Sequence, residues 1–326
     1  MPYIMPEIVA KAKQMDLLTY LQNYEPHELV RVSGNTYCTR SHDSLKISNG
    51  KWFWWSRGFG GRSALDYLIK VNGLSFVDAV QQITRQAASN PPVFIPIQQQ
   101  QPKALMLPAR YPHTDAIEGY LESRGIDRDL IERCIYSGQL YENHNYVEAS
   151  NRTYINAVFV GFDKDRTARY ASLRGINGSF KGEAIGSDKR YSFSFPANES
   201  CGTLHLFESA IDLLSYVSIM KRTGKAYHQE HLLSLAGVYQ PQKKLEESKI
   251  PVALSQYLQD YPFIERIELH LDNDRAGRLA TAALMTILAD RYQAIKAPPP
   301  CGKDFNDCLQ EYIQSRKRTN RRTASR

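Results

Sequence analysis

LDNDRAG, residues 271–277, stands between a β-favouring run at 264–271 and a helix-favouring run at 276–289. LFESAID, residues 206–212, has the same setting upstream, after a short run in which Leu alternates with polar residues. In a parallel sheet whose strands alternate with helices, acids that end neighbouring strands gather at one edge of the sheet. Carboxylate oxygens gathered in one crevice are the ligands that Mg²⁺ prefers. The two stretches therefore predict an α/β fold with a metal site at this edge.

Acids at these positions also have a simpler explanation, because an Asp or Glu before a helix often caps it or offsets its dipole. Taken singly, Glu208 and Asp274 fit that role. Asp272 and Asp274 are two residues apart in an extended segment and so point the same way. Capping alone does not require both motifs, and we favour a metal site. His205 and His270, which flank the motifs, are predicted to be packed or solvated rather than catalytic.

The two motifs together resemble those of the topoisomerase-primase (Toprim) domain, which bacterial DNA primases, topoisomerases and some nucleases share. The resemblance covers residues 201–309 and implies that Glu208, Asp272 and Asp274 are catalytic. GKDFND, residues 302–307, is similar to a primase Lys-Asp-Pro-Asp segment, with its second acid, Asp307, displaced by one residue. The implied metal ligands are Glu208, Asp212, Asp272, Asp274 and Asp304, and the implied ion is Mg²⁺ or Mn²⁺.

The preceding segment strengthens the primase resemblance. YLESRGI, residues 120–126, followed by a β-favouring run at 154–162, resembles the small subdomain that precedes the Toprim fold in primases. That subdomain implies a basic surface for template and nucleotide phosphates. Scattered basic residues on strand edges also serve solubility and protect against aggregation, and this explanation stands equally for each of them. The candidate phosphate-binding residues are Arg174, Lys181, Lys189 and Arg190.

The N-terminal segment resembles the zinc-ribbon module that begins bacterial primases. Cys38 and His42 match its first half, whereas Trp55 and Gly58 stand where the second half has cysteines. Two ligands do not close a structural zinc site, so we expect no zinc. The segment is similar to the degenerate zinc-finger modules of Toprim proteins carried by bacterial mobile elements of the plasmid or transposon type.

The aromatic run WFWW, residues 52–55, is expected to replace the metal as a source of stability. At the period of a strand, two of the four rings face inward and two face outward. Inward rings would pack, and outward rings would be available for stacking on nucleic-acid bases. Arg57 and Arg62 lie close by in sequence and are candidate contacts for nucleic-acid phosphates.

Composition and punctuation predict several parts in this chain of 326 residues. Its net charge of +7 includes six basic residues in 315–326, so the remainder is nearly neutral and any nucleic-acid surface must be a local patch. The predicted parts are a degenerate zinc-ribbon-like module (1–88), a Pro/Gln-rich linker (89–104), a primase-like basic α+β subdomain (105–198), a Toprim domain (199–312) and a basic disordered tail (313–326).

Other features narrow the expected function. The five cysteines are scattered, and no signal-peptide core or membrane span is evident, so we expect a cytoplasmic protein without membrane contact. The chain has no phosphate-binding P-loop. We expect a primase-like nucleotidyltransferase that acts on single-stranded DNA and nucleotides in replication or transfer of a mobile element, with a helicase or another replication or conjugation protein as partner. The alternatives are a Toprim-type nuclease and a non-catalytic nucleic-acid-binding protein.

Overall fold

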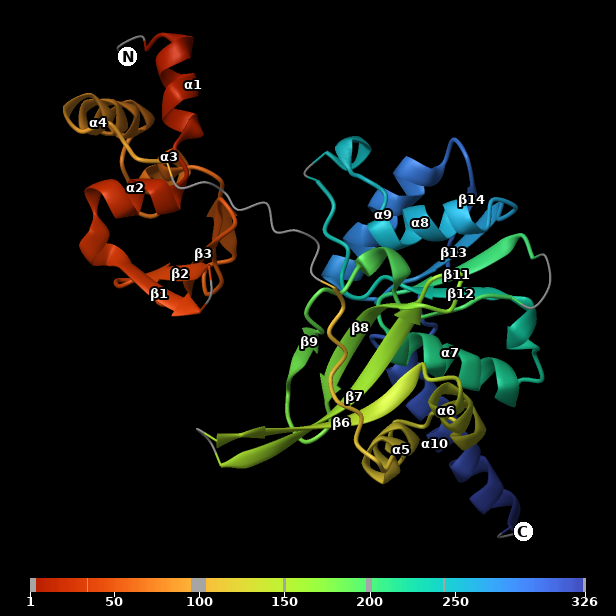
Figure 1. The fold of residues 1–326 in the computed structure, drawn as a ribbon. Coiled ribbons are helices and arrows are strands. Elements are labelled where there is room, and N and C mark those ends of the chain that lie inside the picture. The colour runs from red at the N-terminus through yellow and green to blue at the C-terminus, as the bar shows by residue number, and fades with distance from the viewer. Residues whose placement is uncertain are drawn as a thin grey trace. The chain divides into compact units, whose positions relative to one another are not determined.

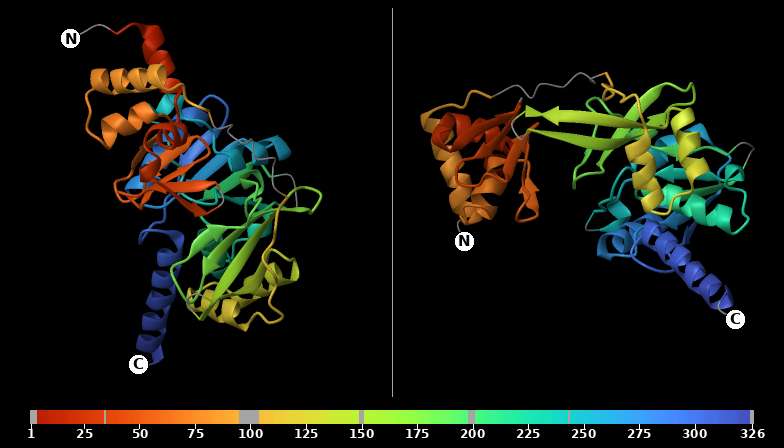
Figure 2. Two further views of the ribbon diagram at one scale, coloured as in Figure 1. Left: turned by 60° about the vertical axis from the view of Figure 1, so that its left-hand side comes forward. Right: turned by 90° about the horizontal axis from the view of Figure 1, so that it is seen from below.

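The chain folds into two compact units, residues 1–101 and residues 102–326, in the computed structural model (Figures 1 and 2). Each unit has its own hydrophobic core. No helix in the described ranges combines the length and apolarity that crossing a bilayer needs. The structure describes residues 4–33, 35–94, 104–148, 151–197, 201–242 and 244–324.

The N-terminal unit is a five-stranded antiparallel sheet, in sequence order, packed against helices. Side chains of Asp16, Ser63 and Ser75 accept hydrogen bonds from backbone N–H groups and thereby begin three of these helices. The elements are α1 (Pro6–Gln14), α2 (Leu17–Tyr24), β1 (Leu29–Ser33), β2 (Thr36–Thr39), β3 (Leu45–Ser48), β4 (Lys51–Trp54), β5 (Phe59–Gly61), α3 (Ala64–Lys70) and α4 (Phe76–Ser89).

The aromatic run on β4 alternates as the sequence predicts. Trp52 is 2% exposed and lies in the core, whereas Trp55, just after the strand, is 69% exposed. Trp54 contacts His42, with ring centroids 4.2 Å apart, and Phe53 packs edge-on against Trp55 on the outer face. The inner rings therefore stabilise the unit, and the outer pair is open to a ligand.

The C-terminal unit is built on two sheets, which confirms the predicted α/β class with a parallel sheet and flanking helices. The first sheet is antiparallel, in the order β6-β7-β8-β9. The second has the order β10-β12-β11-β13-β14, in which β10 alone runs antiparallel. The strands are β6 (Leu140–Val147), β7 (Arg152–Phe162), β8 (Ala168–Gly175), β9 (Lys181–Glu183), β10 (Ser194–Phe195), β11 (Thr203–Phe207), β12 (His231–Ser234), β13 (Arg266–His270) and β14 (Gln293–Lys296).

Helices cover both faces of the parallel sheet (Figure 1). Leu204, Leu206, Ile267 and Leu269 share one face, as their period-two spacing predicts, and pack against α8 and α9. Phe207 lies on the opposite face, in a core that includes α7 and α10 and also residues of α5, α6, β6 and β7. The helices are α5 (Asp115–Ser123), α6 (Arg128–Tyr136), α7 (Ala210–Arg222), α8 (Val252–Asp260), α9 (Arg275–Leu288) and α10 (Phe305–Ala324).

This shared core joins the two parts predicted as residues 105–198 and 199–312. β10 precedes the expected boundary yet pairs with β12 of the parallel sheet, so the structure unites both parts in one unit. Residues 198–200, where that boundary was expected, and residues 95–103 of the expected linker lie outside the described residues.

Two details differ from expectation. α10 continues to Ala324 through the segment expected to be a disordered tail, because Phe305 and Leu309 anchor it in the core and Arg, Lys and Gln favour helix. In α9 the spacing predicts an apolar stripe that includes Leu279, but this side chain is 49% exposed. Of the predicted stripe of Leu279, Ala283 and Ile287, Ala283 is fully buried; the other buried residues of the helix are Gly277, Ala280, Thr281, Leu284 and Leu288.

Candidate active site

The acidic cluster forms where β11 and β13 end side by side. Phe207 and His270 are paired across these parallel strands, and Glu208 and Asp272 follow them. The backbone N–H of Asp272 donates a hydrogen bond of 3.2 Å to Glu208 Oε1. Glu208 is only 5% exposed, so strand pairing and this hydrogen bond fix a buried carboxylate beside the second motif.

Gly277 lets α9 begin directly against these acids. A Cβ atom added at this position would lie 2.1 Å from the carbonyl oxygen of Asp272 and 2.9 Å from Glu208 Oε1. The backbone N–H of Gly277 donates a 2.9 Å hydrogen bond to Asp274 Oδ1, so Asp274 is the N-cap of the helix. Asp274 therefore has the capping role considered above. Its second oxygen faces Lys303, and Asp274 itself does not line the cavity described below.

Lys303 supplies the positive charge of the cluster. Its Nζ lies 3.3 Å from Asp272 Oδ2 and 3.3 Å from Asp274 Oδ2. The two aspartates raise the pKa of Lys303, which keeps its ammonium group charged. Asn273 N–H donates to the carbonyl oxygen of Lys303 at 2.7 Å, so the loop that carries the lysine is tied to the acidic motif. An ammonium group thus occupies a place between two carboxylates that a metal ion would suit.

Burial and mutual repulsion shift the carboxyl groups of the cluster. Burial, reinforced by the charge of Asp272, raises the pKa of Glu208 to about 7. Burial, reinforced by Asp304 and Asp272, raises the pKa of Asp212 to about 7. Burial also raises the pKa of Asp272. Clustered oxygen donors whose charges are unfavourable without a cation fit a divalent ion.

The remaining predicted acids divide between the cavity and its surroundings. Asp212 lies in the first turn of α7, where its carboxylate accepts a hydrogen bond from Ser209 Oγ. Asp304 Oδ1 accepts from Asp307 N–H at 2.8 Å, just before α10. Glu208, Asp212, Asp272 and Asp304 line one cavity of about 540 Å³, whereas Asp307 accepts a hydrogen bond from Lys303 N–H and does not line it.

Basic side chains from β8 and β9 line the same cavity as the acids. Arg174 and Lys181 are paired across these strands, and both line the cavity. Lys189 lies outside the lining and forms an ion pair of 2.7 Å with Glu183, which does line it. The structure thus brings two of the four predicted basic residues to the acids, and a third to a neighbour of the cavity.

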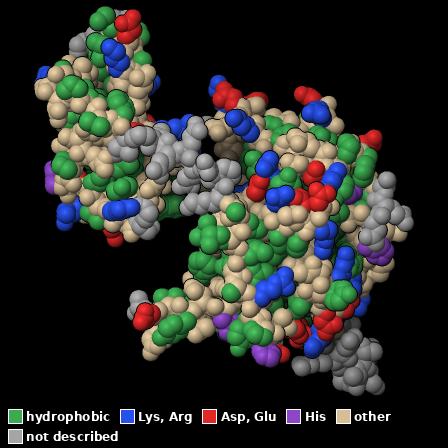
Figure 3. All heavy atoms as spheres, viewed as in Figure 1, with side chains coloured by type: hydrophobic (Ala, Val, Ile, Leu, Met, Phe, Trp, Pro, Cys, Tyr) green, Lys and Arg blue, Asp and Glu red, His purple; other side chains and the backbone are tan. Residues whose placement is uncertain are grey.

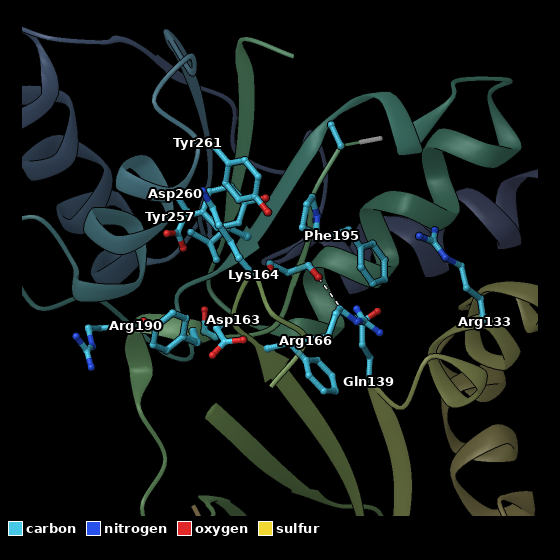
Figure 4. A pocket seen from close by; sticks show the side chains of 17 residues that line it. Arg133, Gln139, Asp163, Lys164, Arg166, Arg190, Phe195, Tyr257, Asp260 and Tyr261 are labelled. Carbon is cyan, nitrogen blue, oxygen red and sulfur yellow. Dashed lines mark hydrogen bonds between the residues drawn. The ribbon is translucent and has the colours of Figure 1, made fainter. Parts of the chain in front are cut away.

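Arg190 lies in a different place. Its Nε donates to both carboxylate oxygens of Asp188, at 3.0 and 2.9 Å, and it lines a second pocket of about 310 Å³ (Figure 4). In that pocket Lys164 Nζ lies 5.2 Å from the centre of the Tyr261 ring. The predicted acids do not line this pocket. Arg57 and Arg62 belong to the N-terminal unit, where Arg57 lies over the ring of Trp54.

Charges of both signs are mixed on the surface that Figure 3 shows. On the face of the molecule shown in Figure 3, Lys and Arg side chains are interspersed with Asp and Glu. This distribution matches the nearly neutral charge of residues 1–315.

Two further residues of the site, Arg124 and Lys303, had no predicted role, although both stand in segments that carry the family resemblance. Arg124 lines the cavity, and its Nε is buried without a hydrogen-bond partner among the described residues. Arg124 stands in YLESRGI, and Lys303 stands in GKDFND. Both segments resemble primase segments, so the resemblance could have indicated these two residues. Their proximity to the acids depends on α5 and α10 packing beside α7, which local patterns do not reveal.

Known families match the C-terminal unit in two adjoining stretches. The Toprim-like family model matches residues 205–309. A model described as a protein of unknown function, DUF3991, matches residues 119–200.

Two relatives are similar to this chain in sequence. An uncharacterized protein of Bacillus anthracis, pXO2-78, is 26% identical over 352 residues, which cover 98% of this chain and 94% of the relative. A 65 kDa protein of Zymomonas mobilis subsp. mobilis is 28% identical over 165 residues, which cover 47% of this chain and 26% of the relative.

Solved primase structures are also similar. The primase fragment of the bacteriophage T7 primase-helicase protein has 16% identity and a TM-score of 0.39, over 85% of this chain and 91% of that chain. The E. coli primase catalytic core has 17% identity and a TM-score of 0.38, over 60% of this chain and 69% of that chain. The acidic cluster, from Glu208 to Asp304, lies within residues 205–309, the stretch that the Toprim-like family model matches.

Proposed function

We propose that this protein is a primase-like, divalent-metal-dependent nucleotidyltransferase that acts on single-stranded DNA in replication or transfer of a mobile element. One observation carries the proposal: a single cavity is lined both by the carboxylates of Glu208, Asp272 and Asp304 and by the basic side chains of Arg174 and Lys181. Phosphoryl transfer needs both a site for metal ions and groups that hold phosphates. The Toprim-like family match of this region supports the same class of function.

Glu208, Asp272 and Asp274 would hold Mg²⁺ or Mn²⁺, with Asp212 and Asp304 available for a further ion. When bound, such an ion neutralises charge on the reacting phosphate and activates an attacking hydroxyl. The protein's own contribution is to fix the carboxylates: Asp272 N–H orients Glu208, and the backbone of Gly277 orients Asp274. Without a cation, burial and the neighbouring carboxylates raise the pKa of Glu208 to about 7, and a divalent ion held by this carboxylate would lower it again.

Arg174, Lys181 and Arg124 would bind the phosphates of template and nucleotide. Arg174 and Lys181 extend from adjacent strands toward the cavity, and Arg124 borders it from the end of α5. Arginine suits this role because its planar guanidinium donates two parallel hydrogen bonds to one phosphate. A separate helicase, or another replication or conjugation protein in the cytoplasm, would expose the template strand.

Incorporation of labelled nucleotides on single-stranded DNA, with Mg²⁺ or Mn²⁺, tests the proposal. Glu208→Gln and Asp272→Asn are expected to abolish product, because each removes a carboxylate from the cavity. Asp307→Asn is the control, since Asp307 lies in the first turn of α10, three residues after Asp304, but does not line the cavity. Template cutting that depends on the same two acids would make the protein a nuclease. If the protein neither synthesises product nor cuts the template, the enzymatic proposal is overturned, and a nucleic-acid-binding protein remains.

A further inference from the structure

A second group of potential ligands lies inside the parallel sheet, apart from the acidic cavity. His205 on β11 and Glu268 and His270 on β13 each offer one ligand atom, and these atoms lie within 4.8 Å of one another. His205 Nδ1 is 2.8 Å from His270 Nε2. Glu268 Oε2 is 3.5 Å from each of these nitrogens. Among the described residues, this is the one group of three or more His, Cys, Asp or Glu side chains with such spacing.

The sheet itself brings the three side chains together. His205 is paired with Glu268 across β11 and β13, and His270 lies two residues further along the strand on the same face. That face is covered by α7 and α10, and the rings of Tyr216 and Phe305 pack against His270. Both histidines are almost fully buried.

The hydrogen bonds of the histidines leave one nitrogen unsatisfied. His270 Nδ1 lies 2.8 Å from the carbonyl oxygen of Ala297, so it carries the proton and Nε2 presents a lone pair to His205. His205 Nδ1 must then donate to that lone pair, which leaves His205 Nε2 without a proton. This nitrogen is buried without a hydrogen-bond partner among the described residues, and Glu230 Oε2 lies 3.7 Å from it. A lone pair buried near a carboxylate is unfavourable.

We propose that His205 Nδ1, His270 Nε2 and the Glu268 carboxylate bind a divalent transition-metal ion of the Zn²⁺ class. Both inward nitrogens then become ligands, and the proton of His205 moves to Nε2, where it faces Glu230. Histidines that bind metals commonly direct the other ring N–H at a carboxylate or a backbone carbonyl, as Glu230 and Ala297 provide here. Two imidazoles and one carboxylate are the protein ligands of known three-ligand zinc sites.

The distances suit such an ion after a small adjustment. Metal–ligand bonds of about 2.0–2.1 Å at tetrahedral angles place ligand atoms about 3.3 Å apart. The two distances from Glu268 Oε2 to the nitrogens, 3.5 Å each, are close to this value. The two nitrogens, 2.8 Å apart, must separate by about half an ångström to receive the ion.

This site differs from the acidic cavity in chemistry and in role. Imidazole ligands favour zinc and similar ions, whereas a set of carboxylates favours Mg²⁺ or Mn²⁺. The ion would join β11 to β13 directly before Glu208 and Asp272, and would thus hold the two acidic strand ends in register. The site is also separate from Cys38 and His42 of the N-terminal unit, where we expect no zinc.

Metal content of the full-length protein tests the inference without any activity assay. The protein is incubated with Zn²⁺, desalted and analysed for metal, and Co²⁺ is added in parallel to follow its visible d–d absorption. We expect one equivalent of Zn²⁺ in the native protein. Glu268→Gln and His205→Asn are expected to lower the affinity at least tenfold. Circular dichroism shows whether each variant is folded. The Co²⁺ spectrum of the native protein tests the site even if the variants do not fold.

Three control variants locate the ion. His231→Asn removes another buried histidine, Cys38→Ser removes the N-terminal candidate, and Asp272→Asn alters the acidic cavity. All three are expected to retain the equivalent of zinc. If the native protein binds no zinc and gives no Co²⁺ d–d band, the inference is overturned, and the contact between the two histidines is a hydrogen bond. Loss of zinc in Cys38→Ser, or its full retention in Glu268→Gln, would also overturn it.

Discussion

Lys303 Nζ lies 3.3 Å from Asp272 Oδ2 and equally close to Asp274 Oδ2, so its ammonium group stands where a metal ion bound to both carboxylates would lie. Mg²⁺ binding at this pair therefore competes with an ammonium group. We expect Lys303→Met to increase the apparent Mg²⁺ affinity about 1.4- to 5-fold, because exposed ion pairs contribute about 0.2–1 kcal/mol. The Mg²⁺ dependence of the melting temperature measures this effect. Lys244→Met, which removes an exposed lysine paired with Glu247, is the control, and unchanged affinity in Lys303→Met would contradict the prediction.

Gly277→Ala tests whether α9 must start directly against the acids. Its added methyl group meets the Asp272 carbonyl oxygen at 2.1 Å, and backbone atoms do not give way as flexible side chains do. We expect a loss of about 1–3 kcal/mol in the free energy of unfolding, measured in urea, and a weakened Mg²⁺ response. Gly119→Ala in α5 is the matched control, because a Cβ there meets no atom within 4 Å. It should be neutral or stabilising by up to about 1 kcal/mol. Equal stability of both variants would refute the close-approach argument.

Arg174 and Lys181 should matter for nucleic-acid binding more than Arg190. We expect Arg174→Ala and Lys181→Ala each to weaken binding to single-stranded DNA and to reduce the slope of log affinity against log salt by about 0.7, the value for one phosphate contact on a single strand. Arg190→Ala should leave both quantities nearly unchanged, because Asp188 already holds its guanidinium and it lines the other pocket. Fluorescence anisotropy over a salt series provides the measurement. A loss confined to Arg190→Ala would place the DNA in the second pocket instead.

The aromatic run of the N-terminal unit should separate stability from binding. Trp52→Ala removes a buried ring whose Nε1 donates to the carbonyl oxygen of Ser63, and should cost about 3–5 kcal/mol of stability. Trp55→Ala removes an exposed ring, so stability should change by less than about 0.5 kcal/mol. If the outer face stacks on bases, Trp55→Ala should lower single-stranded DNA affinity by about 1–3 kcal/mol. Unfolding curves measure the stability, and anisotropy measures the affinity for DNA. Unchanged affinity of Trp55→Ala would show that this ring does not stack on bases.

His231 should make the protein less stable in acid. Burial lowers its pKa to about 4, and its Nδ1 lies 2.9 Å from the Tyr257 hydroxyl. Below the ordinary pKa of 6.5 the unfolded chain binds a proton that the native protein does not, so stability falls as pH decreases from 6.5 toward 4. The slope from this one group approaches about 1.4 kcal/mol per pH unit.

The comparison with His231→Asn isolates that contribution. Glu208 and Asp212, whose pKa values are raised, contribute with the opposite sign in the same range, so the difference between native and variant urea midpoints is the relevant quantity. The difference should shrink steadily from pH 7 to pH 4.5. A constant difference would show that His231 does not titrate in this way.

The strand ends that hold the acids were predictable because two local rules agree. Period-two burial places Leu204, Leu206 and Leu269 on one face, and in a parallel sheet the residues after neighbouring strands meet at one edge. The orientation of α9 was not predictable from apolar spacing. It is set by the contact of Gly277 with the Asp272 backbone, and this contact turns Leu279 toward solvent.

Charge partners were beyond the reach of sequence for a similar reason. Arg174 and Arg190 look alike in a basic, glycine-punctuated run, yet Asp188 holds Arg190 while Arg174 lines the cavity. Lys303 meets Asp272 only because the loop before α10 crosses the end of β13. The length of α10 was missed because its basic composition suggested disorder, while its anchor in the core lies several residues earlier.

The position of α10 in the chain has a consequence for biosynthesis. Asn306 donates hydrogen bonds to the carbonyl oxygen of Arg124 and to Ser215 Oγ, so the start of this helix joins α5 to α7. The ribosome makes residues 303–309 after every strand of the parallel sheet. Until they emerge, Asp272 and Asp274 lack Lys303, and α7 alone covers a face of the sheet that α10 also covers in the complete unit. A chain stalled before residue 303 should therefore be a substrate for chaperones, and the acidic centre is completed only when this segment docks.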